Sequence, residues 1–253
     1  EINEFKIIFF WEYFHRLWGR IIGIIFIIPF LFFLKNKQIS KKHALKLTLI
    51  LFLGTFQAFI GWWMVNSGLV KNPDISQYRL AIHLFNAFII MFFILWLILD
   101  LYEGESKIKF NFSFLILIIL CLTIIAGAFV AGMDAGLMYN TYPLMNDKIL
   151  PEQYGELGYL DPLENPGSAQ FHHRHLGLIC LIGLIFFYYK NHKKNQIRLR
   201  VNFLLVLILL QFGLGIFILL SYIPIAFASL HQVGAMLIFL IMISVIHTEN
   251  VKP

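Results

Sequence analysis

Charged residues and cysteines are both scarce in this 253-residue chain, and each shortage excludes a class of protein. Asp, Glu, Lys and Arg together make up 13% of the residues, whereas soluble globular domains carry about a quarter. An ordinary soluble domain is therefore excluded. The two cysteines, Cys121 and Cys180, lie within apolar stretches and have no CxxC spacing. We interpret them as small buried residues, which excludes a disulfide framework and a redox pair.

Long apolar stretches make up most of the chain, and hydrophobic residues account for 59% of it. A helix of about 20 apolar residues is long enough to cross a bilayer. Seven stretches approach that length and predict seven transmembrane helices, at residues 17–34, 44–65, 80–99, 113–133, 169–189, 201–222 and 223–246. The sequence therefore predicts an all-α polytopic membrane protein whose surroundings are membrane lipid.

Basic residues are concentrated in alternate loops, which predicts an orientation in the membrane. The first predicted helix is followed by Lys35, Lys37, Lys41, Lys42 and Lys46, and the fifth by Lys190, Lys193, Lys194, Arg198 and Arg200. By the positive-inside rule both loops are cytoplasmic. Residues 134–168 carry six acidic side chains against Lys148 alone and fall on the opposite side. The net charge of +6 is mostly this topology signal, and nucleic acid is not expected as a partner.

Four histidines share one local pattern. His15, His83, His173 and His231 each carry a glycine or alanine four residues later, which is one helical turn along the same face. On the predicted topology all four lie near the outer ends of their helices. A small residue beside an imidazole leaves room for a flat ring, and a porphyrin needs an axial nitrogen ligand with such room. Haem is therefore the predicted occupant.

The motifs around these histidines occur twice in the same order. The three motifs are His-Arg-x-x-Gly, Gln-x-x-x-Gly and His-x-x-x-Ala. They begin at His15, Gln57 and His83, and they recur about 150 residues later at His173, Gln211 and His231. This order indicates an internal duplication. We expect two tandem, pseudo-symmetric four-helix bundles, each holding one bis-histidine haem. Residues 101–253 form the complete second bundle, and residues 1–100 form the first bundle without its first helix. The two glutamines are predicted to bond across helices or to contact the cofactor, and the glycines after them to allow close helix packing.

Three arginines lie beside or one turn from the predicted ligands. Arg16, Arg79 and Arg174 are near the membrane interface, where haem propionates would emerge, and bidentate carboxylate pairing would suit them. Membrane anchoring is an equally good explanation for any one of them. The outer segment 134–168 is rich in proline and glycine and is predicted to be irregular and to fold over the outer haem edge as a lid.

One carboxylate breaks the symmetry between the halves. Glu12 precedes His15 by three residues and shares its helix face, whereas Gln170 occupies the matching position before His173. This difference predicts that the two sites have different functions. The first site would perform chemistry, with Glu12 as a general base or as a stabiliser of positive charge, and the second would carry electrons. A solvated interfacial acid is the alternative reading of Glu12.

Six stretches spread over nearly the whole chain carry a family resemblance: EFKIIFFWEYFHRLWGRIIG, GWWMVNSGL, YRLAIHL, DAGLMYNTYPLMN, QFHHRHLG and LHQVGA. In content and order they resemble haem A synthases of the mitochondrial and alphaproteobacterial type. The resemblance implies an oxidoreductase of cytochrome oxidase assembly that oxidises the methyl group at ring carbon 8 of haem O, through an alcohol and a hydrated aldehyde, to the formyl group of haem A. It also implies that His15 and His83 bracket the substrate haem iron, with Glu12 beside it, and that His173 and His231 hold the iron of a haem b cofactor.

Two features depart from that family. The family has eight helices, and the duplication agrees, because residues 113–133 precede His173 without an equivalent before His15. We therefore expect a chain that lacks its first helix, which leaves open whether the first site is intact. His172 and His175 flank His173 where the family usually has other residues. His173 is the expected ligand, because it alone of the three is followed immediately by Arg and four residues later by Gly.

The resemblance and the orientation together predict a multi-pass protein of a bacterial inner membrane, rather than a mitochondrial one, with haem sites toward the periplasm. The implied partners are haem O, the haem O synthase that supplies it and an electron acceptor that the sequence does not identify. Formation of a homo-oligomer is left open.

Two other classes of protein could share the histidines. A non-catalytic di-haem cytochrome b that exchanges electrons with quinone would need neither Glu12 nor asymmetric sites. A transporter with a histidine proton relay would need ionisable residues across the whole membrane. These histidines cluster at one face, which counts against the transporter.

Overall fold

The computed structural model describes residues 2–66 and 75–251. Within these ranges the regular structure is helical, with seven long helices, one short helix and two 3-10 turns. Their bounds are α1 (Ile2–Lys35), α2 (Lys41–Val65), α3 (Gln77–Tyr102), α4 (Phe112–Gly132), η1 (Ala135–Leu137), η2 (Gly158–Leu160), α5 (Asp161–Glu164), α6 (Pro166–Asn191), α7 (Arg198–Leu220) and α8 (Ile225–Asn250). The seven long helices are each long and apolar enough to cross a membrane. The chain is an all-α polytopic membrane protein, as predicted.

The first helix begins much earlier than its apolar stretch indicates. We predicted residues 17–34, but α1 runs from Ile2 to Lys35. Before residue 17, polar side chains interrupt the apolar pattern from which the helix was predicted. Aromatic rings one turn apart nevertheless contact each other along this segment, with centroid separations of 5.9 Å for both Phe10–Phe14 and Phe14–Trp18. Glu12 and His15 consequently both lie within α1, as the argument about their shared face requires.

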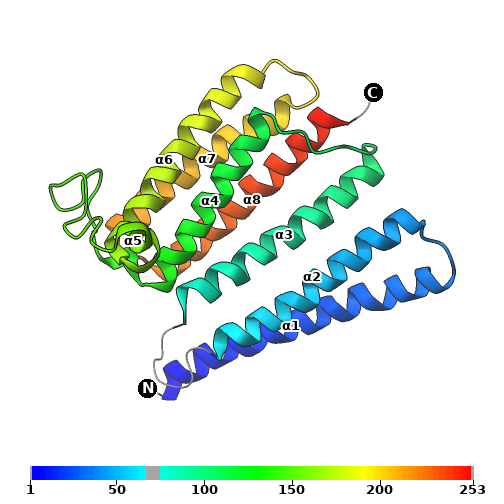
Figure 1. The fold of residues 1–253 in the computed structure, drawn as a ribbon, viewed down its shortest axis with the longest axis horizontal. Helices are drawn as coiled ribbons and strands as arrows, with labels where there is room; N and C mark the ends of the chain where they lie inside the picture. The colour runs from blue at the N-terminus through cyan, green and yellow to red at the C-terminus, as the bar shows by residue number, and fades with distance from the viewer. Residues whose placement is uncertain (1, 67–74, 252–253) are drawn as a thin grey trace. The chain divides into compact units, whose positions relative to one another are not determined.

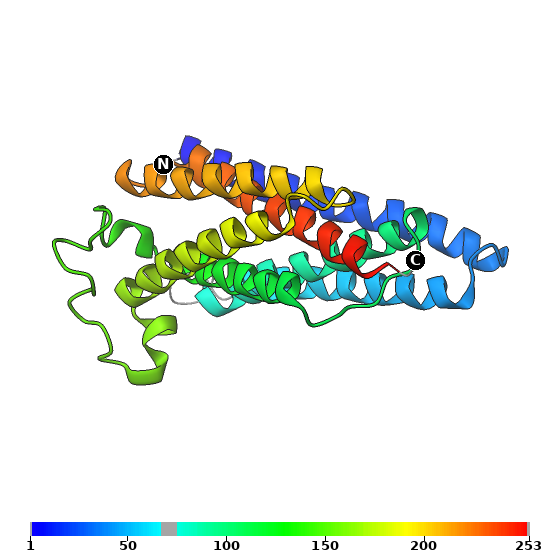
Figure 2. The same ribbon diagram turned by 90° about the horizontal axis from the view of Figure 1, so that it is seen from above.

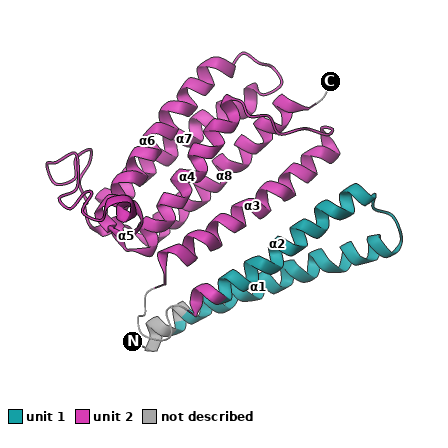
Figure 3. Ribbon diagram, in the orientation of Figure 1, with its two compact units in different colours: residues 1–62 teal, residues 63–253 magenta. Residues whose placement is uncertain are grey.

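Two compact units divide the chain, residues 1–62 and residues 63–253 (Figure 3). The first unit contains α1 and most of α2, joined by a short turn. Lys37 in this turn has φ 55°, a left-handed conformation that ends α1. Ser40 Oγ accepts a hydrogen bond of 3.3 Å from the backbone N–H of His43 and so caps the start of α2. The predicted division of the protein into two halves at residue 100 stays a prediction.

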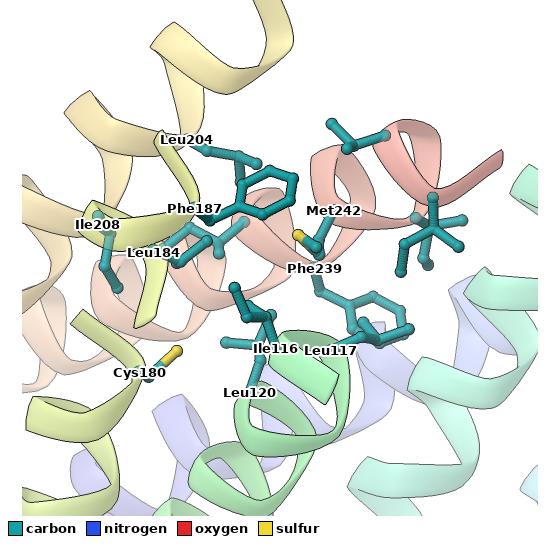
Figure 4. Packing of buried hydrophobic residues seen from close by; sticks show 14 of the residues in the cluster. Ile116, Leu117, Leu120, Cys180, Leu184, Phe187, Leu204, Ile208, Phe239 and Met242 are labelled. Carbon is teal, nitrogen blue, oxygen red and sulfur yellow. The ribbon is translucent and has the colours of Figure 1, made fainter. Parts of the chain in front are cut away.

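The second unit is built from α3, α4, α6, α7 and α8, which run alongside one another (Figures 1 and 2). Helix α4 packs against α3, α6 and α8, and α7 packs against α6 and α8. Large apolar side chains from these helices fill the space between them (Figure 4), among them Ile116, Leu184, Phe187, Leu204 and Met242. Side chains on the outward faces are also apolar, which is expected where lipid replaces water as the solvent.

The last two helices are separated by a sharp turn. We predicted adjoining helices that met between residues 222 and 223, but α7 ends at Leu220 and α8 begins at Ile225. Tyr222 and Ile223 both have φ 58°, and a left-handed conformation cannot continue a right-handed helix. The turn reverses the chain and lets α8 pack along α7.

Residues 133–165 connect α4 to α6 and are mostly irregular, as predicted. Asp161 organises this segment. Its carboxylate accepts hydrogen bonds from the backbone N–H groups of Gly155 at 2.9 Å and Leu157 at 3.3 Å, from Asn165 Nδ2 at 3.2 Å and from the hydroxyl of Ser168. Burial by itself raises the pKa of Asp161, but the hydrogen bonds, that of Ser168 first, outweigh it and hold this pKa below its ordinary value. One carboxylate thus ties the loop to the start of α6.

A second polar cluster lies where α3 and α8 end and α7 begins. His247 is fully buried, and its Nε2 lies 3.0 Å from Asp100 Oδ1. Glu103 forms an ion pair with Arg200 and accepts a hydrogen bond of 2.7 Å from the hydroxyl of Thr248. Burial by itself raises the pKa of Glu103, but the hydrogen bonds from Arg200 and Thr248 outweigh it and hold this pKa below its ordinary value. The cluster joins three helices at this end of the unit.

Candidate functional site

Two of the four predicted ligands come together inside the second unit. The imidazoles of His173 on α6 and His231 on α8 have ring centroids 6.4 Å apart, and their planes are inclined by 75°. A metal–nitrogen bond to imidazole is about 2 Å long, so two imidazoles on opposite sides of one metal ion have ring centres about 6 Å apart. Haem iron can be held between two axial histidines in this way. The spacing of His173 and His231 therefore suits a shared haem iron.

Hydrogen bonding prepares His173 for this role. Its Nδ1 lies 3.0 Å from the backbone carbonyl oxygen of Thr123 on α4. Because a carbonyl only accepts, Nδ1 carries the proton and donates it, which leaves the lone pair of Nε2 available to a metal. Histidine ligands of metals commonly donate through the other nitrogen in this manner.

His231 has an unsatisfied nitrogen. Within the described part of the chain, its buried Nδ1 has no hydrogen-bond partner. A buried polar atom without a partner costs about 1–3 kcal/mol. This unpaired nitrogen lies beside a second imidazole. In the described part of the chain, a Cβ atom at Gly177, one turn after His173, would also have nothing within 4 Å. Both features fit a site that binds a further group. The residues present therefore fit a haem.

Glycines of the neighbouring helices lie against both imidazoles. A Cβ atom at Gly127 of α4 would meet Cε1 of His173 at 3.0 Å, and one at Gly215 of α7 would meet Cε1 of His231 at 3.1 Å. The sequence pattern had singled out Gly215 for helix packing, but it missed Gly127 altogether. The only available signal was a glycine inside a strongly apolar helix, and a lone glycine of that kind does not identify its neighbour.

Gln211, which the sequence predicts either to bond across helices or to contact the cofactor, bonds across helices. Its Nε2 donates a hydrogen bond of 2.8 Å to the backbone carbonyl oxygen of His231. Gly234 lies directly against this side chain, since a Cβ atom there would be 2.1 Å from Gln211 Oε1. The glutamine on α7 therefore holds the backbone of the predicted ligand on α8.

The residues around His173 also hold the loop that follows α4. Gln170 is buried, and its Nε2 donates hydrogen bonds of 3.2 Å to the carbonyl oxygens of both Gly136 and Tyr139. Arg174 donates to the carbonyl oxygens of Tyr139 at 2.6 Å and Thr141 at 3.0 Å. These contacts place residues 136–141 beside the site, where we predicted a lid. Binding of a propionate by Arg174 stays a prediction.

The loop is also tied to α7. Asn140 Nδ2 donates to the carbonyl oxygen of Leu219 at 2.9 Å and to that of Gly136 at 3.2 Å. The ring of Tyr142 lies edge-on to Phe212, with centroids 6.4 Å apart. The loop thereby joins the end of α4, the start of α6 and the end of α7.

Of three neighbouring histidines, His173 is the one that faces His231. His172 Nε2 lies 3.4 Å from the hydroxyl of Tyr154. His175 Nδ1 donates at 2.8 Å to the carbonyl oxygen of Phe171, one turn back on its own helix. The structure thus supports the choice of His173 among the three.

The predicted ligands of the first site belong to different compact units. His15 lies on α1 and is exposed, whereas His83 lies on α3 and is half-buried. Their pairing stays a prediction. Glu12 lies on α1 three residues before His15, and its carboxylate accepts a hydrogen bond of 2.9 Å from Arg16, with both side chains about half exposed.

Arg79 lies one turn before His83 on α3. Its Nη1 donates a hydrogen bond of 2.7 Å to the carbonyl oxygen of Trp63, and its guanidinium carbon lies 4.4 Å from the centre of the Trp63 ring. Arg79 therefore has a hydrogen bond and a cation–π contact with α2. Its predicted contact with a propionate is still a prediction.

Comparison with known proteins gives one consistent match. The family described as cytochrome oxidase assembly protein matches residues 1–243. A protein of Pelagibacter ubique named Heme A synthase is 41% identical over 94% of this chain and 72% of its own length. Proteins with the same name from Nitrosospira multiformis and Flavobacterium johnsoniae are 40% and 37% identical, over 94% and 98% of this chain and 70% and 76% of their own lengths.

Proposed function

The chain belongs to the cytochrome oxidase assembly protein family, and from that premise we propose that it oxidises haem O to haem A. The reaction converts the methyl group at ring carbon 8 into a formyl group in two successive oxidations. Relatives named Heme A synthase match nearly the whole chain. The observation that carries the proposal in the structure is the pair His173 and His231, with centroids 6.4 Å apart. The names of these relatives do not favour the di-haem electron carrier.

The second site is the one that we assign to a resident haem b. His173 and His231 would hold its iron, with His173 oriented by the Thr123 carbonyl. When bound, haem b supplies one-electron transfer. Gln170 and Arg174 hold residues 136–141 beside the imidazoles, and this cover would limit the access of water to the site. The loop would keep the environment of the haem apolar.

The first site is the one that we assign to the substrate haem O. His15 and His83 would bracket its iron, and Glu12 would act on the substituent that reacts. Oxidation at this carbon releases protons, and a carboxylate one helical turn from a ligand is placed to accept one as a general base. Arg16 holds the Glu12 carboxylate at 2.9 Å. The absence of a carboxylate at position 170 then confines the chemistry to the first site.

The protein would act in a bacterial inner membrane, with both sites toward the periplasm. The chain is a multi-pass membrane protein, and its basic loops at residues 35–46 and 190–200 favour the cytoplasm as their location. Haem O would be delivered by the enzyme that makes it, and the electrons would leave to a membrane acceptor. Arg16, Arg79 and Arg174 are the candidates for contact with propionates.

Mass spectrometry of extracted haems tests the proposal. The full chain is expressed in a host that makes haem O, purified and extracted, and a host without haem O provides the control. Haem b together with haem O, its hydroxylated product or haem A is the expected result. Two haems b per chain would instead identify an electron-carrying cytochrome, and the lack of any haem would contradict both functions.

A matched pair of variants assigns the second site. We expect His231→Ala to lose haem b. His175→Ala should keep it, because His175 bonds to its own helix. Equal haem b content in the two variants would show that His231 is not a ligand.

A further inference from the structure

Helices α4 and α7 each contact a predicted ligand at two points, one helical turn apart. On α4, the carbonyl of Thr123 accepts from His173 Nδ1 at 3.0 Å, and Gly127 lies against the same imidazole. On α7, Gln211 donates at 2.8 Å to the carbonyl of His231, and Gly215 lies against the imidazole of His231. Residues four apart share one helix face, so each helix presents an anchoring group and a glycine to one histidine.

The glycines contact the imidazoles and not the backbone of a packed helix. For both Gly127 and Gly215, the three heavy atoms closest to a Cβ would all belong to the imidazole. Gly132 shows the contrasting case, since its Cβ would meet the Cα of Gln77 on α3 at 2.7 Å. Gly132 serves the close approach of two helices, whereas Gly127 and Gly215 leave space for a ring.

Together the two contacts restrict how each ring can turn. The terminal torsion of a histidine side chain is broad and has no strong preference of its own. In His173 the hydrogen bond at Nδ1 fixes one edge of the ring and Gly127 receives Cε1. In His231 the hydrogen bond from Gln211 holds only the backbone, so the contact with Gly215 is what restricts rotation of the ring. The two planes are inclined by 75°.

We infer that Gly127 and Gly215, with the Thr123 carbonyl and the Gln211 amide, are positioning residues that set the rotation of both axial imidazoles. The inference rests on the proposed assignment of haem b to this pair. If both imidazoles bind one haem iron, the angle between their planes affects the splitting of the iron d orbitals, so these positions would tune the spectrum and the reduction potential of the haem. Groups that orient a metal's ligands are known to tune the metal in this way.

Paired glycine substitutions test the inference. Gly215→Ala would bring a methyl group to 3.1 Å from Cε1 of His231, so the ring must turn or shift, whereas Gly213→Ala on the same helix meets nothing within 4 Å in the described structure. Gly127→Ala and Gly183→Ala form the corresponding pair for His173, since a Cβ at Gly183 would be 3.9 Å from its nearest neighbour, Ile116. The full-length variants are purified with their haem. Haem b content, the low-temperature electron paramagnetic resonance spectrum of the ferric haem and its reduction potential are measured.

We expect Gly215→Ala and Gly127→Ala to shift the largest g value of the low-spin signal and the potential, or to lose haem b, while both controls match the unmodified protein. Spectra and potentials identical to those of the controls would overturn the inference. If the unmodified protein binds no haem b through these histidines, the proposed assignment of haem b to this pair is wrong. This failure can be told apart from failure of the inference about the glycines, because it appears without any glycine substitution.

A variant of Gln211 keeps the test decisive if the alanine variants fail to fold. Gln211→Met preserves the length of the side chain but cannot donate to the His231 carbonyl. It should shift the same spectrum with haem b content unchanged, and Gln211→Asn, which keeps the amide on a shorter side chain, should lie between the two. A Gln211→Met spectrum identical to that of the unmodified protein would overturn the role of the amide.

Discussion

Glu12 and Gln170 occupy matching positions, three residues before a histidine, and their side chains have different surroundings. Gln170 is buried and donates to two carbonyl groups of the loop after α4, which a carboxylate could not do. Glu12 is exposed and accepts from Arg16. The asymmetry that the sequence showed thus has a structural reason in the second half, namely that an amide is needed to hold the loop.

Replacing Glu12 tests the proposed catalytic role of this residue apart from cofactor binding. Glu12→Gln should lower the rate of haem O oxidation by about 10²–10⁴-fold, the usual contribution of general acid–base catalysis. Thermal stability should hardly change, because exposed ion pairs one turn apart contribute about 0.3–0.5 kcal/mol. Mass analysis of the extracted haems over time measures the rate, and haem b content should equal that of the unmodified protein.

Glu156→Gln provides the control for Glu12→Gln, since Glu156 is an exposed acid of the loop between α4 and α6. Product formation at the ordinary rate in Glu12→Gln would make Glu12 a solvated interfacial acid.

At the scale of helices, the number and type of elements followed from the sequence because apolar stretches of spanning length have few other stable structures in a membrane. Boundaries were less predictable. The start of α1 lay outside the apolar stretch, and the break at Tyr222 and Ile223 depends on two non-glycine residues with positive φ. Neither of these is encoded by hydrophobicity.

Contacts between helices were the least predictable feature. The sequence indicates which histidines lie near helix ends, but Gly127 meets His173 only because α4 and α6 cross at that point. The pairing of His173 with His231 was predictable, since it follows from the duplication. The anchoring groups Thr123 and Gln211 depend on the rotation of each helix about its axis, which the weakly amphipathic sequences of membrane helices do not specify.

Acid should open the loop between α4 and α6 through Asp161. The pKa of the Asp161 carboxyl is lower in the folded loop than in an open one. The carboxylate therefore contributes fully to the stability of the loop above the open-state pKa of about 3.9. This contribution is lost as the pH falls through the lower pKa of the folded loop. We therefore expect pepsin to cut residues 134–165 much faster well below pH 4 than at pH 5, when the rate at each pH is divided by the rate for Asp161→Asn at the same pH. The fragments are mapped by mass spectrometry.

Two variants serve as controls for this experiment. Asp161→Asn should leave the loop open to proteases at every pH, because a neutral amide cannot accept four hydrogen bonds as the carboxylate does. Asp147→Asn changes an exposed acid of the same loop and should behave as the unmodified protein. Cleavage of the loop that is insensitive to Asp161→Asn would show that other contacts hold it.

The polar cluster at the other end of the helices should contribute to stability without affecting haem. Asp100→Ala leaves Nε2 of the buried His247 without this hydrogen-bond partner, and leaving a buried polar group unsatisfied costs about 1–3 kcal/mol. We expect a lower midpoint of thermal unfolding in detergent. His247 lies sixteen residues beyond His231 on α8, or about 24 Å along the helix, so haem b content and spectrum should be unchanged.

Asp100→Asn is the milder control, because the amide oxygen can still accept from the backbone N–H of Ser106, now 3.2 Å from the carboxylate. Its unfolding midpoint should lie between those of Asp100→Ala and the unmodified protein. Equal midpoints for all three would mean that the cluster does not stabilise the fold.

On the scale of the whole molecule, the orientation in the membrane decides which compartment the sites face. Proton release and electron transfer would then be assigned to that side. The end of the second unit that carries His173 and His231 also carries the loop 133–165, where α6 and α8 begin (Figures 1 and 2). The opposite end carries the basic turn between α6 and α7. Labelling the two ends in cells therefore determines which side of the membrane the proposed haem site faces.

Single cysteines at the two ends make this measurement. Tyr159 is 89% exposed in the loop between α4 and α6, and Asn195 is exposed in the turn between α6 and α7. If the basic turn is cytoplasmic, Tyr159→Cys should react with a membrane-impermeant maleimide on intact bacterial cells, and Asn195→Cys only after permeabilisation. The unmodified protein gives the background, which should be low because Cys121 and Cys180 lie inside α4 and α6. The reverse pattern would place the histidine pair at the cytoplasmic face, and the electrons and protons of the reaction would then be released on that side.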